Sequence, residues 1–212
     1  MRHRQFLRAA LLGLTVATVS FTAAADVAGA QAFVEKEHSI IKKLVEANAP
    51  VSDVTKAIDG MIDYDEIAQR ALGKPCPTAV PQCTNHWDTL NDAQKKEIRD
   101  LFKALVEKKY RENAYKTKDF DVSYRGAKEQ TTDVTKVRTE AKNKQKPREP
   151  PVQVDYLIRS SGATHKVVDY AFEGSLVTKN YYESSDKILK RDGYQALVNK
   201  LREKLNTPAK KQ

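Results

Sequence analysis

Val167-Val-Asp-Tyr-Ala-Phe-Glu-Gly-Ser-Leu-Val-Thr-Lys-Asn-Tyr181 is the stretch of the chain in which a strand pattern gives way to a helix pattern. Up to Phe172 the larger apolar side chains occupy every second position, which is typical of a strand with one buried face. Gly174 and Ser175 end this pattern, and from Leu176 onward the apolar residues recur at helical spacing. The stretch therefore predicts a sheet that leads directly into a C-terminal helix.

Three more segments with a period of two lie upstream of this strand. They are residues 120–125, 134–141 and 152–158, and short connections separate them. Strands that follow one another at such short distances usually pair as antiparallel neighbours. We therefore expect a curved, four-stranded antiparallel sheet with one apolar face.

Helical patterns occupy the chain on both sides of the expected sheet. Residues 33–45, 51–62 and 64–72 carry apolar side chains at helical spacing, and a long helix is expected to begin after Asn91. A glutamine follows Asn91 by three residues, which is the sequence pattern of a capping box. Gly193 is expected to separate two C-terminal helices. The expected fold class is α+β, with N-terminal and C-terminal helices packed against the apolar face of the sheet.

The first residues have the pattern of a cleavable signal peptide. Arginines at positions 2, 4 and 8 precede an uncharged run from Ala9 to Ala25, and small residues typical of signal-peptidase sites end the run. We expect cleavage after Ala30, with Ala25 as the alternative position. A transmembrane anchor is the competing interpretation, but the run is short for a bilayer span and no stop-transfer cluster follows it. The sequence therefore predicts export from the cytoplasm.

The expected mature chain, residues 31–206, is long enough for a single α+β domain with a sizeable core. The basic residues 207–212 are expected to form a disordered tail. The whole chain has a net charge of +9, and removal of residues 1–30 lowers the charge to +7. Because the protein is expected outside the cytoplasm, nucleic acid is not expected as a partner for this charge. Anionic membrane surfaces, cell-wall polymers and acidic proteins remain as candidates.

Cys76 and Cys83 bracket a proline-rich stretch of the mature chain. An even number of cysteines in an oxidising compartment favours a disulfide. A metal pair or a redox-active dithiol is the alternative, but the spacing of the cysteines and the lack of a nearby histidine cluster argue against both. We expect a structural disulfide that fixes the shape of a small loop.

The residue patterns of metal sites and of catalytic nucleophiles are missing from the sequence. His38, His86 and His165 are isolated, with none of the spacings that zinc sites use. The acidic residues at 63–66 suit acid–base chemistry, but Asp63 is better explained as the N-cap of the helix that follows it. We expect no catalytic residue, no metal and no cofactor, and the protein is not expected to be an enzyme.

Two blocks of the sequence together resemble the MlaC family, also called the toluene-tolerance auxiliary components of ABC transporters. The first block runs from Asp63 to Gly73 and continues with Trp87 and the capping-box segment. The second block is the stretch quoted above, with Glu173-Gly-Ser-Leu-Val at its centre. The order of the expected elements also matches this family from the first helix to the last.

The resemblance implies a periplasmic phospholipid carrier that works as a monomer. It implies transfer of lipid between an outer-membrane lipoprotein–porin complex and an inner-membrane ABC transporter with MCE domains. It also implies an apolar cavity between sheet and helices, with phospholipid as cargo rather than as a cofactor. From strand alternation and the apolar stripe of the long helix, we expect this cavity to be lined by Leu105, Tyr110, Val122, Tyr124, Val154, Tyr156, Ile158, Val168, Tyr170 and Phe172.

Three other functions remain open. A carrier on the same scaffold suits another apolar cargo, such as a hopanoid-like lipid. An envelope enzyme acting on a lipid needs convergent ionisable groups in its pocket, and the sequence shows none. A cationic scaffold protein would bind an anionic surface or partner through its net charge.

Overall fold

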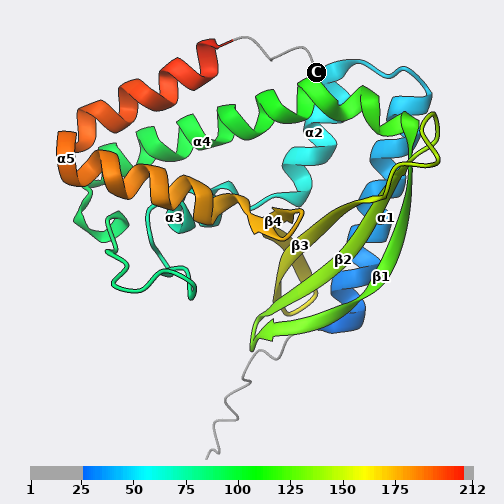
Figure 1. Ribbon diagram of the computed structural model, residues 1–212, viewed down its shortest axis with the longest axis horizontal. Helices are drawn as coiled ribbons and strands as arrows, with labels where there is room; N and C mark the ends of the chain where they lie inside the picture. Colours follow the sequence, from blue (N-terminus) through cyan, green and yellow to red (C-terminus); the bar gives the residue numbers. More distant parts are fainter. Residues whose placement is uncertain (1–25, 208–212) are drawn as a thin grey trace, which may run out of the picture.

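The computed structural model describes residues 26–207, without the side chains of residues 110–114 and 116 (Figure 1). Residues 1–25 of the expected signal peptide and 208–212 of the expected tail lie outside this range. The helices are α1 (Val27–Glu46), α2 (Val51–Met61), α3 (Tyr64–Arg70), η1 (Trp87–Thr89), α4 (Asp92–Asn113), η2 (Ala114–Asp119) and α5 (Val177–Asn206). The strands are β1 (Phe120–Thr131), β2 (Val134–Asn143), β3 (Val152–Ser161), β4 (Thr164–Phe172) and β5 (Ser175–Leu176).

The fold class is α+β, as expected, but the sheet has five strands in the order β1-β2-β3-β4-β5 instead of four. Each strand pairs antiparallel with the next one along the chain. The additional strand, β5, is two residues long and folds back on the end of β4. It forms because Glu173 and Gly174 both have positive φ values, 49° and 76°, which makes the two-residue turn of a tight hairpin. The sequence pattern around Gly174 indicated only the end of a strand.

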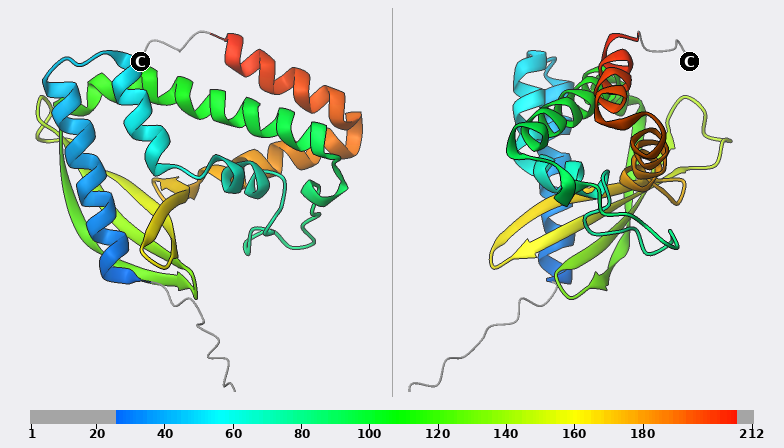
Figure 2. Two further views of the ribbon diagram at one scale, coloured as in Figure 1. Left: turned by 180° about the vertical axis from the view of Figure 1, so that it is seen from behind. Right: turned by 90° about the vertical axis from the view of Figure 1, so that its left-hand side faces the viewer.

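The helix α1 covers one face of the sheet, and α3, α4 and α5 lie beside and beyond one end of it (Figure 2). The helix α1 lies across β1, β2, β3 and β4 and defines what we call the inner face of the sheet. One cluster of buried apolar side chains joins α1, α2 and this inner face, and another joins α3, α4 and α5. Within the described residues, no helix combines the length and the apolar character needed to cross a bilayer.

Local features that the sequence predicts set the ends of several helices. The Asp63 side chain accepts a hydrogen bond from the backbone N–H of Glu66 at 2.9 Å and so caps α3. Asn91 and Gln94 exchange side-chain-to-backbone hydrogen bonds at 2.9 and 3.0 Å, which confirms the capping box before α4. Gly193, with φ of 79°, interrupts α5 at the expected position.

The disulfide between Cys76 and Cys83 is confirmed, with the two Cα atoms 5.8 Å apart. It closes the loop between α3 and η1. The loop leaves α3 through Gly73, whose φ is 85° and whose Cα lies against the backbone of Thr84 and the ring of Tyr182. The backbone N–H of Thr84 donates a hydrogen bond to the Tyr182 hydroxyl at 2.8 Å, which ties the loop to α5.

Candidate functional site: an apolar strip on the inner face of the sheet

Cross-strand register brings most of the expected lining residues to the inner face. Tyr124 lies opposite Thr139, which lies opposite Val154, which lies opposite Phe172. The neighbouring rows add the other expected residues of the same face, which are Val122, Tyr156, Ile158 and Tyr170. The period-two pattern therefore identified one face of β1 and β3 correctly, and the end of β4 as well.

Val168 does not belong to this face. Leu157 pairs with Asp169, but Ile158 pairs with Val167, so Val168 is an extra residue in β4. Such a bulge shifts the alternation by one residue. Val167 therefore joins the inner-face cluster, whereas Val168 packs with Leu157 on the opposite face. The expectation for Val168 was wrong because the sequence pattern carries no sign of the bulge.

Of the two lining residues expected from α4, the structure describes the side chain of only one. Leu105 is 5% exposed and packs in the cluster that joins α3, α4 and α5. The side chain of Tyr110 lies outside the described residues.

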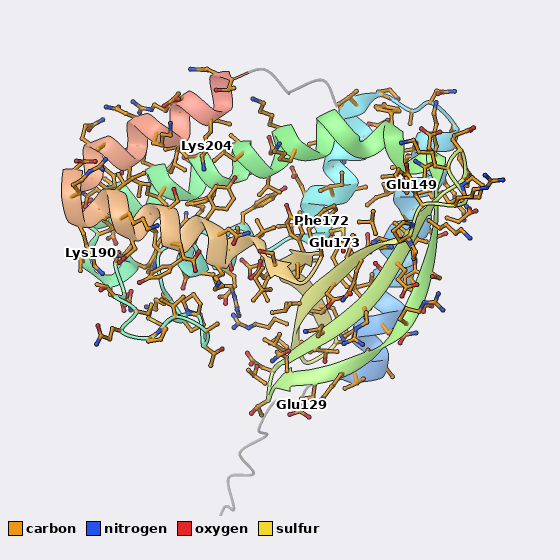
Figure 3. The ribbon with its side chains drawn as sticks, viewed as in Figure 1. Glu129, Glu149, Phe172, Glu173, Lys190 and Lys204 are labelled. Atoms are coloured by element: carbon orange, nitrogen blue, oxygen red, sulfur yellow. A yellow bond between two sulfur atoms is a disulfide. The ribbon has the colours of Figure 1, made fainter. Side chains whose placement is uncertain are left out.

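The inner face is buried at the end that α1 covers and is more exposed at the opposite end. Ile158 and Val167, which α1 covers, are 0% and 1% exposed. At the opposite end, Val122 is 43% exposed and Phe172 is 53% exposed; Figure 3 shows Phe172 beside Glu173 at the end of β4. The residues at this less covered end form what we call the apolar strip: Val122, Ala141, Val152, Val154, Tyr170 and Phe172.

The expected enclosed apolar cavity is not found among the described residues. Two pockets that these residues form lie at other places, one on the outer face of β1 and β2 and one beside Leu101 between α4 and α5. Part of the reason is that tyrosine rings fill the space under α1, since Tyr124 and Tyr156 pack against the buried cluster there. In the described part of the chain, the inner face therefore offers a ligand an open apolar strip instead of an enclosed cavity.

Three ionisable side chains on or against the inner face, His38, Tyr156 and Tyr170, are neutral at pH 7. His38 of α1 lies between Tyr124, whose hydroxyl oxygen is 3.1 Å from Nδ1, and the ring of Tyr156. Burial lowers the pKa of His38 to about 4, so its imidazole carries no charge. Burial also raises the pKa of Tyr170 to about 12 and raises the pKa of Tyr156 well above its usual value. Sequence reasoning missed His38 because its place opposite two tyrosines depends on the long-range packing of α1.

A buried carboxylate fixes the junction between β4 and α5. Asp169 is 1% exposed, and its Oδ1 atom accepts hydrogen bonds from the backbone N–H groups of Tyr170 at 2.8 Å and Thr178 at 3.1 Å. The Thr178 hydroxyl donates to Oδ2. Burial raises the pKa of Asp169, and the hydrogen bonds from Thr178 and Tyr170 oppose part of that rise. This junction sets where Tyr170 and Phe172 stand relative to α5.

The fold and the strip define a class of α+β protein in which helices cover part of one sheet face and leave an apolar strip exposed at its end. The family model described as MlaC protein matches residues 34–203 of this chain. The chain belongs to the MlaC family.

A solved structure with a similar fold is that of the phospholipid-binding protein from Ralstonia solanacearum in complex with a phospholipid. The two chains are 22% identical, the match covers 83% of this chain and 96% of that chain, and the TM-score is 0.66. This similarity shows the fold. A comparison with curated proteins finds no match.

Proposed function

We propose that this protein is a periplasmic phospholipid carrier and that acyl chains bind along the apolar strip. The observation that carries the proposal is the exposure of Val122 and Phe172 on one face of the sheet of an MlaC-family protein. A contiguous patch of apolar side chains on a protein surface often marks a binding site. The Ralstonia protein of similar fold, which is described in complex with a phospholipid, supports the same ligand class.

The chemistry of the strip suits an acyl chain better than a polar ligand. Aliphatic and aromatic side chains line it, and each CH₂ group of a bound chain that leaves water contributes roughly 0.8 kcal/mol. The nearby His38, Tyr156 and Tyr170 are neutral at pH 7 and add no charge that a lipid tail would have to desolvate. The same neutrality favours binding over acid–base catalysis.

Transport between two membranes completes the proposal. The N-terminal segment has the pattern of a cleavable signal peptide, which would place the mature chain in the periplasm. As in its family, the chain would take lipid from or deliver lipid to an outer-membrane lipoprotein–porin complex and an inner-membrane MCE-domain ABC transporter. Because we expect a monomer with one strip, we expect one protein molecule to carry one phospholipid molecule.

The direct experiment is to purify the protein from the periplasm without detergent and to extract it with organic solvent. Mass spectrometry of the extract should show phospholipid in a fixed ratio to protein. A preparation that reproducibly contains no phospholipid, and that takes none up from vesicles, would contradict the proposal. Recovery of a different apolar lipid instead would favour a carrier for that cargo, such as a hopanoid-like lipid.

A further inference from the structure

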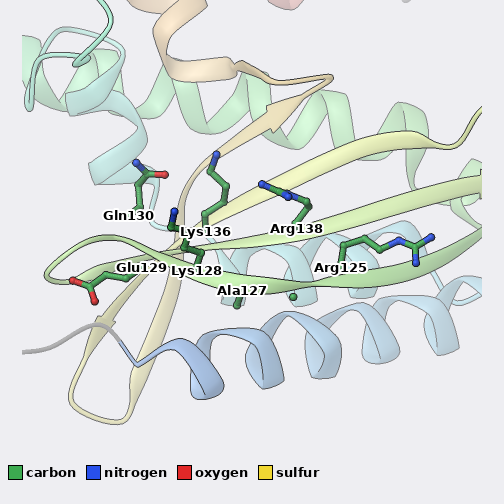
Figure 4. Close-up of a pocket in the computed structure, with 8 residues that line it drawn as sticks. Arg125, Ala127, Lys128, Glu129, Gln130, Lys136 and Arg138 are labelled. Atoms are coloured by element: carbon green, nitrogen blue, oxygen red, sulfur yellow. The ribbon is translucent and has the colours of Figure 1, made fainter.

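A group of positively charged side chains lies on the outer face of the ribbon formed by β1 and β2, opposite the face that α1 covers. Arg125 and Lys128 of β1 and Lys136 and Arg138 of β2 line a hollow of about 470 Å³ there. One carboxylate, that of Glu129, and the uncharged residues Gly126, Ala127 and Gln130 complete the lining. Figure 4 shows Lys136 and Arg138 pointing away from α1. We call these four residues and the hollow between them the cationic groove.

A bulge in β1 brings these cations together. Tyr124 pairs with Thr139, whereas Ala127 pairs with Val137, so the alternation of β1 shifts between these two positions. Gly126, with φ of 92° and open space around it, allows this backbone path. In a regular strand, side chains whose positions differ by an odd number point to opposite faces. Without the shift, Arg125 and Lys128, which are three positions apart, would therefore lie on opposite faces of the ribbon.

The charge of the cationic groove is only partly neutralised within the chain. Arg125 forms an ion pair with Glu140 at 2.7 Å, and Lys136 lies 3.8 Å from the buried carboxylate of Asp155. Within residues 26–207, Lys128 and Arg138 are exposed and have no ion-pair partner. Two cations on adjacent strands are therefore available to an external anion.

We propose that the cationic groove is a docking surface for a carboxylate-rich segment of a partner protein. Arginine and lysine bind carboxylates through charge-assisted hydrogen bonds, and complementary charge steers the encounter of two proteins. The groove is hollow, so it fits a protruding acidic loop or helix better than the flat surface of a bilayer. The large apolar side chains that the structure exposes, Ile40, Val51, Val122 and Phe172, all lie outside the groove, so it offers no side chain for membrane insertion.

The position of the groove also favours a protein partner, a step that rests on the proposed function. The groove is on the outer face, whereas the apolar strip is on the inner face of the same sheet. A carrier held to a bilayer by the groove would turn its strip away from that bilayer. A carrier held by an acidic segment of a partner keeps the strip free to exchange lipid with another part of that partner.

The test measures binding of a fluorescent oligoglutamate peptide by fluorescence anisotropy across a range of salt concentrations. The variant Lys128→Gln/Arg138→Gln removes the two unpaired cations. The matched control, Lys56→Gln/Lys187→Gln, removes the same charge from two exposed lysines on α2 and α5. Co-sedimentation with phosphatidylcholine vesicles that contain phosphatidylglycerol is measured for the same three proteins.

We expect the wild type to bind oligoglutamate with an affinity that falls as salt rises, since salt screens exposed charges. The groove variant should bind roughly tenfold more weakly, and the control variant should bind nearly as well as the wild type. Equal weakening in the two variants, or no binding by the wild type at low salt, would overturn the proposal. So would a groove variant that loses only vesicle binding, because the occupant would then be a membrane. The peptide measurement requires no bound lipid, so its outcome is independent of whether the protein carries phospholipid.

Discussion

The carboxylate of Asp169 accepts two hydrogen bonds from one residue, Thr178, through its backbone N–H and its hydroxyl. Both residues are at least 95% buried, at 1% and 5% exposure. A buried carboxylate that loses a donor keeps its desolvation cost, so the junction between β4 and α5 depends on this pair.

Thr178→Val should lower the free energy of unfolding by about 1–3 kcal/mol, because it removes the hydroxyl donor and leaves Oδ2 of Asp169 unpaired. Urea denaturation followed by circular dichroism measures the change. The control Asp192→Asn removes an exposed ion pair with Arg191 and should change stability by less than about 0.5 kcal/mol. A Thr178→Val variant as stable as this control would contradict the role given to the pair.

Acidification should destabilise the protein through His38, whose pKa falls from 6.5 to about 4 in the folded chain. Above about pH 6.5 the imidazole is neutral in both states; between that pH and about 4 only the unfolded chain takes up the proton. The contribution of His38 to the free energy of unfolding is therefore fully present above this window. It is lost as the pH falls through the window, and the loss reaches roughly 2 kcal/mol at about pH 5. His38→Gln should lose correspondingly less stability than the wild type in urea denaturation at about pH 7 and about pH 5. The same loss in both proteins would show that other groups cause it.

Alanine substitutions at Gly73 and Gly126 distinguish the cost of a positive φ from the cost of a close contact at the Cβ position. Their φ values are similar, 85° and 92°, but a Cβ at Gly73 would lie 2.5 Å from the Thr84 carbonyl oxygen, whereas a Cβ at Gly126 meets nothing within 4 Å. Both Ala variants should pay about 1 kcal/mol for the positive φ. Gly73→Ala should lose clearly more, because backbone must move to relieve the contact. Thermal unfolding of the two variants checks this order, and equal losses would rule out the close approach at Gly73.

The mature chain should begin at Asp26, although the sequence pattern alone favours a cut after Ala30. The Asp26 side chain accepts a hydrogen bond from the backbone N–H of Gly29 at 2.8 Å and so caps α1, and its carbonyl oxygen accepts from the N–H of Ala30. Ala30 is fully buried in the main cluster. Cleavage after Ala25 keeps this turn, which is worth about 1 kcal/mol for the cap alone. Intact mass and N-terminal sequencing of the exported protein decide the matter; a chain that starts at Gln31 would refute the prediction.

Sequence patterns predicted the parts of the fold that depend on local regularity. The alternation of β1 and β3, the caps at Asp63 and Asn91 and the break at Gly193 each follow from a few neighbouring residues. They did not predict β5, because a two-residue strand is too short to show a period.

The parts of the site that sequence patterns could not give depend on contacts between distant segments. The bulge at Val168 arises from how β4 pairs with β3, and it moves one predicted residue to the other face. Leu105 is buried because α3 and α5 pack against α4, and this packing joins segments that are distant in the sequence. The contact of His38 with Tyr124 joins residues 86 positions apart, and no local pattern records it.

The central claim is that acyl chains bind on the apolar strip, and its most direct test compares Val122→Asp with Val51→Asp. The two valines are almost equally exposed, at 43% and 44%, but Val122 lies on the strip and Val51 at the start of α2. Both variants should fold, since each places a charge at an exposed position. Native mass spectrometry of protein purified from the periplasm should show phospholipid on the wild type and on Val51→Asp, and should show at least about tenfold less on Val122→Asp, because a carboxylate would have to lose its hydration against the acyl chain. Equal lipid content in the two variants would contradict binding at the strip.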